Sequence, residues 1–178
     1  TEGLRDFHDQ GELKKLLTGL NKIKNEKKIE CPIAIKISPD IKDDEISKIV
    51  ELVSSHNIKG IVVSNTTDSN RNNLSDTRKN EIGGLSGQPL KDISTNLIKR
   101  FYKETKGKIK IIGVGGVDSG QSAYEKITAG ADAVQLYTGM VYKGPGIVKE
   151  IKKDLVSILK KENIKNISEA VGINAWPC

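Results

Sequence analysis

The feature that most constrains the fold is a pair of short apolar runs separated by a helix-like stretch. Residues 108–117 form an apolar run that ends in glycines, and residues 131–138 form a second run that ends in Tyr137 and Thr138. Residues 119–129, between them, have the composition of a helix punctuated by glycine. A strand, a glycine turn, a helix and a second strand make a βαβ unit, so the two strands are expected to be parallel.

The rest of the chain repeats this alternation. Leucine and isoleucine recur at helical spacing over residues 12–27, which predicts an amphipathic helix before the first strand. Pro39 ends that first strand, and Asp40 to Asp44 offer caps for the helix that follows. The predicted strands are 32–37, 60–64, 109–113 and 132–136, and the later helices are 40–56, 89–105, 119–129, 144–161 and a short one at 168–171.

Strict alternation of helices with nearly continuous apolar strands predicts an α/β fold, in which a parallel sheet is covered by helices. Four strands are half of a (β/α)8 TIM barrel, which typically needs about 250 residues. In such a barrel the loops after the last two strands form a phosphate cradle. The rival is a doubly wound open sheet, but residues 113–116 lack the final spacing of its GxGxxG fingerprint. We therefore predict the C-terminal half of a barrel.

Composition excludes several classes of function. The net charge is +6, but the lysines are interleaved with acidic residues along helices and aromatic residues are only 4% of the chain. This pattern is typical of solvated helix faces, so we expect no nucleic-acid partner. Cys31 and Cys178 have no metal-ligand spacing, and His8 and His56 stand alone, so we expect no metal site. No apolar run reaches the length of a membrane-spanning helix, and no signal peptide is seen.

Polar residues cluster where the predicted strands end. Lys36 lies inside an otherwise apolar strand. It is either a lysine that extends from the strand end to solvent or a cation beside a group that becomes negative, such as a reduced flavin. The Ser64–Thr67 cluster follows the next strand and can cap a turn or orient a polar, planar substrate. Because barrels place their active sites at this edge, we expect both features to face one site.

Glycines mark the same edge further along the chain. Gly83, Gly84 and Gly87 end a long polar loop over residues 68–88, and loops of this length tend to be functional. Gly115 and Gly116 lie between a clear strand and a helix, where glycines let backbone N–H groups approach an anion. With Tyr137 and Thr138 these residues predict a phosphate site, although an ordinary strand-to-helix turn has the same composition.

Five stretches together resemble the class 2 dihydroorotate dehydrogenases, the quinone-dependent, membrane-associated type. They are residues 32–40, 64–67, 83–90, 111–117 and 135–145, in the family's order and spacing. The resemblance runs from Thr1 to about Gly172, which we take as a partial FMN-binding barrel domain (1–172), and leaves residues 173–178 as a tail.

The resemblance implies a role for eight residues. The positions that match FMN contacts are Lys36, Ser64, Gly87, Gly116, Tyr137 and Thr138, the last two at the phosphate. The positions that match contacts to dihydroorotate or orotate are Asn65 and Thr66. Ser64 departs from the family, which usually has threonine there, but it keeps the hydroxyl group.

The implied reaction is the oxidation of dihydroorotate to orotate in pyrimidine biosynthesis, with electrons passing through FMN to a ubiquinone-type acceptor. The catalytic base of this class is a serine in a motif expected just upstream of Thr1. We therefore expect no catalytic residue within residues 1–178, and no activity from them alone. The quinone-tunnel helices, which attach the class peripherally to the bacterial cytoplasmic membrane or the mitochondrial inner membrane, are also expected upstream.

Two alternatives remain open from the sequence. The chain can be a non-catalytic, flavin- or phosphate-binding half barrel that works as a subunit, or a class 1-like FMN barrel with a different electron acceptor. In either case, a half barrel exposes two strand edges and an inner face, which invites pairing with another chain. The expected partner for these surfaces is the N-terminal half of the barrel.

Overall fold

The structure is a computed structural model that describes residues 10–69, 71 and 74–176. His8 and Cys178 lie outside the described residues. In chain order the elements, with η marking 3₁₀ helices, are α1 (Gln10–Glu26), β1 (Ala34–Ile37), α2 (Asp43–Ser55), β2 (Gly60–Val63), η2 (Gln88–Leu90), α3 (Lys91–Thr105), β3 (Lys110–Val114), α4 (Gly120–Ala129), β4 (Ala133–Gln135), α5 (Thr138–Lys143), α6 (Ile147–Lys161) and η3 (Ile167–Ala170).

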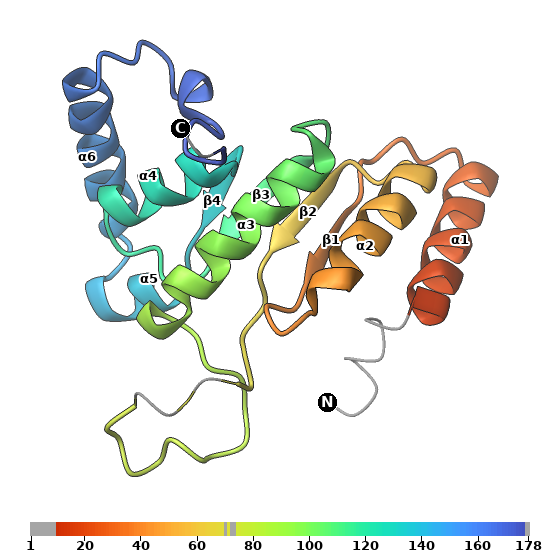
Figure 1. The fold of residues 1–178 in the computed structure, drawn as a ribbon, viewed down its shortest axis with the longest axis horizontal. Helices are drawn as coiled ribbons and strands as arrows, with labels where there is room; N and C mark the ends of the chain where they lie inside the picture. The colour runs from red at the N-terminus through yellow and green to blue at the C-terminus, as the bar shows by residue number, and fades with distance from the viewer. Residues whose placement is uncertain (1–9, 70, 72–73, 177–178) are drawn as a thin grey trace.

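The four strands form one parallel sheet in the order β1-β2-β3-β4. Sequential strands are therefore neighbours, and each crossover between them contains a helix. Figure 1 shows α2 and α3 side by side on the same face of the sheet. The predicted α/β fold, with four parallel strands and covering helices, is confirmed.

The helix-covered face of the sheet carries the main core. Ile61, Val63 and Ile111 are completely buried, and they pack with side chains from the first three helices, among them Leu17 and Phe101. These apolar side chains alternate with residues on the other face, as the period of two in a strand requires. The strands are thus held in place mainly by the helices behind them.

The opposite face of the sheet is open, although nearly continuous apolar strands are typical of sheets that are buried on both faces. Ala34 and Lys36 of β1 and Ala133 and Gln135 of β4 are exposed. An apolar run predicts a strand but does not show whether one face or both faces are covered. The described residues supply helices to one face only.

Three local predictions also need correction. Residues 138–143, for which the sequence predicts no helix, form the short helix α5, although Gly139 and Val141 do not favour a helix by intrinsic propensity. The last short helix is the 3₁₀ helix η3. Asp40 does not cap α2: the backbone N–H of Lys42 instead donates to the Glu45 carboxylate at 2.6 Å.

Asp40 joins the ends of two strands instead. Its carboxylate accepts a hydrogen bond from the Thr67 hydroxyl group and another from the Asp68 backbone N–H at 3.0 Å. Thr67 is completely buried and pairs with Leu85 in an isolated antiparallel bridge. These contacts fix the segment after β2, from which the candidate site residues project.

Candidate functional site

A cavity of about 700 Å³ lies at the carboxyl ends of the strands. This volume is within the range of roughly 300–1,000 Å³ that is typical of small-molecule and cofactor sites. All eight site residues predicted from the sequence line it, namely Lys36, Ser64, Asn65, Thr66, Gly87, Gly116, Tyr137 and Thr138. The structure therefore brings together residues that are up to about a hundred positions apart in the chain, because parallel strands end at one edge of a sheet.

Lys36 reaches the cavity from β1, where it is in register with Val62 of β2. Its side chain is exposed on the open face of the sheet, although its neighbours in the strand are apolar. Its charge nevertheless stands among apolar side chains of the same face, such as Val62 and Ile112, which are partly buried. A cation here is available to a negatively charged ligand group.

The segment after β2 is held by backbone hydrogen bonds. The N–H of Ser64 donates to the Val114 carbonyl at 3.2 Å, and the N–H of Asn65 donates to the Ile37 carbonyl at 2.7 Å. Ser64 is buried, whereas the Asn65 side chain is exposed toward the cavity that it lines. These bonds to the two neighbouring strands hold the Asn65 backbone, so that its amide group is presented from a fixed position.

Thr66 lies against the glycine loop. A Cβ atom added to Gly84 would collide with the Thr66 hydroxyl oxygen, so only glycine allows the loop to approach this closely. Thr66 itself is partly buried and lines the cavity. Asn65 and Thr66 together offer an amide and a hydroxyl group, which can orient a polar ring without adding charge.

Two glycines and a threonine meet at the other end of the cavity. Gly87 and Gly116 have φ angles of 78° and 69°, the left-handed region that favours glycine. A Cβ atom on Gly87 would lie 3.0 Å from Cγ2 of Thr138, and one on Gly116 would lie 3.1 Å from the Gly87 carbonyl oxygen. Ser86 and Thr138 share a hydrogen bond of 2.9 Å between their hydroxyl groups. This close, side-chain-poor arrangement can accept an anion such as a phosphate.

Sequence reasoning missed a polar cluster on the same wall. The amide of Gln88 donates to the Asp118 carboxylate at 2.6 Å, and the Lys143 ammonium donates to the Asp118 backbone carbonyl at 2.9 Å. All three residues line the cavity. Burial acts to raise the pKa of the Asp118 carboxyl, but hydrogen bonds from Gln88 and Ser122 outweigh it and hold that pKa below its usual value. No sequence signal connects Gln88 with Asp118, since Gln88 begins η2 and Asp118 lies 30 residues further along the chain, after β3.

Tyr137 contributes differently from its neighbour Thr138. Its side chain is 79% exposed, and the adjoining α5 also exposes Val141 and Tyr142. Apolar side chains therefore border the cavity on this side.

The described residues contain neither a cluster of three or more His, Cys, Asp or Glu that could hold a metal ion nor a helix long and apolar enough to cross a membrane.

The family model and the individual relatives that match this chain all point to the same family. The family model for dihydroorotate dehydrogenase matches residues 1–159. The chain is 44% identical over 181 residues to the dihydroorotate dehydrogenase (quinone) of Trichodesmium erythraeum, covering 97% of this chain and 47% of the relative. It is 39% identical to the mitochondrial dihydroorotate dehydrogenase (quinone) of Mus musculus, covering 98% of this chain and 45% of the relative.

Solved structures agree with this result. The ligand-free dihydroorotate dehydrogenase of Eimeria tenella superposes with a TM-score of 0.91 at 33% identity, over 99% of this chain and 54% of that chain. The complex of the same enzyme with ferulenol superposes with a TM-score of 0.90 at 34% identity. The four strands and their helices are thus half of the larger α/β fold, as predicted.

The chain spans about half the length of the curated relatives that it matches. Within that span the match is nearly continuous, and the relatives carry the quinone-dependent name. By sequence and by structure, the chain belongs to the dihydroorotate dehydrogenase family.

Proposed function

We propose that this chain supplies the FMN site and the substrate-orienting polar groups of a quinone-dependent dihydroorotate dehydrogenase. The observation that carries the proposal is the convergence of all eight predicted residues on one cavity at the carboxyl edge of the sheet. The quinone-type names of the relatives favour this class over a class 1-like barrel.

The cavity fits FMN by its chemistry. Gly87 and Gly116 line it together with Ser86 and Thr138, whose hydroxyl groups share a hydrogen bond, and this arrangement is suited to the phosphate. Lys36 brings a positive charge to the far side, where it can balance negative charge on the isoalloxazine ring. When bound, FMN supplies a reversible two-electron acceptor for a hydride.

Asn65 and Thr66 are proposed to hold dihydroorotate over the flavin face. An amide can both donate and accept hydrogen bonds, and this suits the ring amides and the carboxylate of the substrate. Oxidation to orotate removes a hydride from one ring carbon and a proton from the next. The proton requires a base, which we assign to a serine preceding Thr1, so residues 1–178 alone are proposed to be inactive.

The remaining parts of the proposal rest on the resemblance. Residues 1–172 are assigned to one barrel half, with 173–178 as a tail, and the partner of that half is the N-terminal half of the barrel. The acceptor is a ubiquinone-type molecule, and attachment is peripheral, at the bacterial cytoplasmic membrane or the mitochondrial inner membrane. The exposed Tyr137 and Tyr142 line the cavity, where an apolar electron acceptor can approach.

The test is a steady-state assay of the natural full-length protein with dihydroorotate and a soluble ubiquinone analogue. Asn65→Ala is expected to lower kcat/KM by roughly 10- to 100-fold, because it removes hydrogen bonds to a polar substrate. Asn25→Ala, on the exposed surface of α1, is the matched control and should retain the wild-type value.

Three results would contradict the proposal in different ways. A wild-type-like rate from isolated residues 1–178 would refute the assignment of the base. Flavin binding without any dihydroorotate oxidation in the full-length protein would favour a non-catalytic subunit. Equal losses in Asn65→Ala and Asn25→Ala would remove Asn65 from the substrate site.

A further inference from the structure

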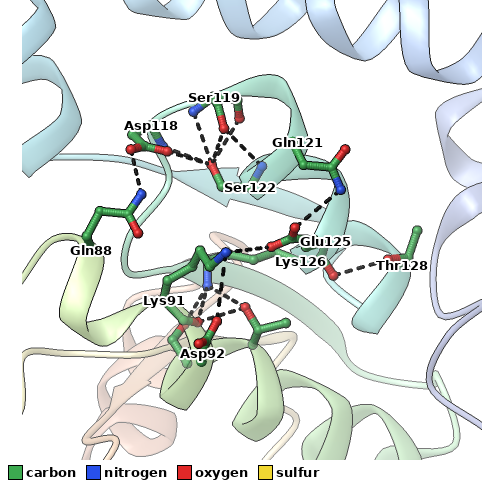
Figure 2. Close-up of polar contacts among 12 residues, drawn as sticks. Gln88, Lys91, Asp92, Asp118, Ser119, Gln121, Ser122, Glu125, Lys126 and Thr128 are labelled. Carbon is green, nitrogen blue, oxygen red and sulfur yellow. Dashed lines mark hydrogen bonds and ion pairs between the residues drawn. The ribbon is translucent and has the colours of Figure 1, made fainter.

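Lys126 is a buried cation that the proposed function leaves unexplained. It is completely buried between α3 and α4, and its ammonium group is surrounded by neutral acceptors (Figure 2). It donates to the hydroxyl oxygens of Ser94 and Thr95, each at 3.0 Å, and to the Lys91 backbone carbonyl at 3.3 Å. A buried charge without a directly bonded carboxylate is unfavourable for stability, so it calls for another explanation.

The hydrogen bonds lead from Lys126 to the wall of the cavity. Ser94, which accepts from the ammonium group, donates to the backbone carbonyl of Val114, the last residue of β3. The same carbonyl accepts from the Ser64 N–H at 3.2 Å. Because a peptide group is planar, fixing the Val114 carbonyl also fixes the direction of the following N–H, that of Gly115.

The helix that Lys126 holds also touches the glycine turn directly. A Cβ atom on Gly116 would lie 2.5 Å from Cβ of Lys91, and one on Gly115 would lie 3.1 Å from Cβ of Ser94. The first turn of α3 is therefore packed against both glycines without space between them. Lys126 bonds to this same turn, through Lys91 and Ser94, so its position is transmitted to the turn by direct contact.

We propose that Lys126 is a positioning residue for the Gly115–Gly116 turn, acting through Ser94 and the first turn of α3. The inference rests on the proposed function in one respect, which is that the turn contacts the FMN phosphate. Lys126 does not reach the cavity itself, since the residues that line it include Gly115 and Gly116 but not Lys126.

The charge on Lys126 matters because three acceptors need three donated protons. An ammonium group supplies three, whereas a neutral amine supplies only two. Burial lowers the pKa of Lys126 to about 8, against the opposing effect of the Glu125 carboxylate. The other charged groups that face the Lys126 ammonium group are Lys91 and Asp92 on α3. Asp154 of α6, which also packs against α4, accepts from the Gly120 N–H at the start of that helix.

The test compares two variants of the natural full-length protein, Lys126→Met and Lys160→Met. The second is the control, because it removes an exposed lysine from α6. We expect Lys126→Met to fold, because Ser94 still donates to Val114 and Thr95 still donates to Lys91. FMN titration by fluorescence should show affinity weakened by about tenfold, the effect of roughly one misplaced hydrogen bond. Ser94→Ala, which cuts the same link, should weaken it similarly, and Lys160→Met should not.

Two further readouts separate positioning from a merely structural role. Backbone amide exchange at Gly115 and Gly116 should be faster in Lys126→Met than in wild type. Wild-type FMN affinity should fall as the pH rises through about 8, where Lys126 loses a proton, and this pH dependence should be absent in Lys126→Met.

Unchanged FMN affinity and unchanged amide exchange in Lys126→Met would overturn the inference. A wild-type protein that binds no FMN would refute the proposed function instead. In that case amide exchange still decides the positioning role: faster exchange at the two glycines supports it, and unchanged exchange refutes it.

Discussion

At the scale of single residues, two glycines with similar positive φ angles have different surroundings. Gly116 and Gly144 have φ angles of 69° and 73°. Gly116 is packed against Lys91, whereas a Cβ atom on Gly144 would meet nothing within 4 Å. The pair therefore compares a glycine whose positive φ is combined with close packing with one whose positive φ is not.

Gly116→Ala is expected to reduce the free energy of unfolding by about 2–5 kcal/mol, since backbone strain adds to a collision with Lys91. Gly144→Ala carries backbone strain without a collision and should lose only about 1–3 kcal/mol. Chemical denaturation of both variants measures the difference. Equal losses would show that packing at Gly116 contributes nothing.

The buried lysine gives a pH-dependent contribution to stability. Its pKa is lowered from 10.5 to about 8, so between these values the unfolded chain holds a proton that the folded chain has released. The contribution of Lys126 to the free energy of unfolding therefore rises with pH across that window. Below about pH 8 the lysine is charged in both states, and the full destabilising effect of burying the charge is present. From about pH 7 to about pH 9.5, wild type should gain about 2 kcal/mol relative to Lys126→Met, and denaturation at several pH values measures this. A constant difference between the two proteins would contradict it.

At the scale of elements, α4 and α6 approach closely at one glycine. A Cβ atom on Gly120, at the start of α4, would collide with Cβ of Asp154 on α6. The second apolar cluster lies beside this contact and includes Ala123, Ile147 and Ile151. The distance between the two helices thus depends on the absence of a side chain at residue 120.

Gly120→Ala is expected to destabilise the protein by about 1–3 kcal/mol, because the two helices must separate. Gly19→Ala is the contrasting variant, since this glycine lies within α1 and its Cβ would meet nothing within 4 Å. Removing a glycine from an open helix position should stabilise by about 0.5–1 kcal/mol. Thermal unfolding should therefore shift in opposite directions for the two variants, and shifts in the same direction would contradict the packing argument.

At the scale of the whole molecule, the sheet has one covered face and one open face. β1 and β4 each pair with a single neighbour among the described strands, so each has an unpaired edge. Lys36, Ala133 and Gln135 lie on the open face. Unpaired strand edges next to an uncovered face favour association with further strands.

Residues 1–178 expressed alone are therefore expected to self-associate. Size-exclusion chromatography with light scattering should give a mass above the 19.4 kDa of one chain. Coexpression with the N-terminal half of a relative should reduce the self-association, because that half supplies partner strands. A sharp monomer peak for the isolated chain would count against an open half barrel.

The sequence by itself determined the order of the elements and the edge at which the site lies. Apolar runs alternating with helices require a parallel sheet, and parallel strands bring their carboxyl ends together. Four residues, Lys36, Asn65, Gly116 and Thr138, could therefore be placed in one cavity without coordinates, because each lies near the carboxyl end of a strand or follows it. Their assigned roles stay predictions.

Only the tertiary structure decided which side chains are covered and which remote residues meet. Lys126 reads as an ordinary helix lysine, yet it is completely buried because α3 and α4 close over it. Lys36 lies in an apolar run, which left open whether its charge is buried, and it is exposed because no second layer covers its face among the described residues. Local periodicity sets the backbone of each element, whereas burial depends on how separate elements pack, and that information is not local in the chain.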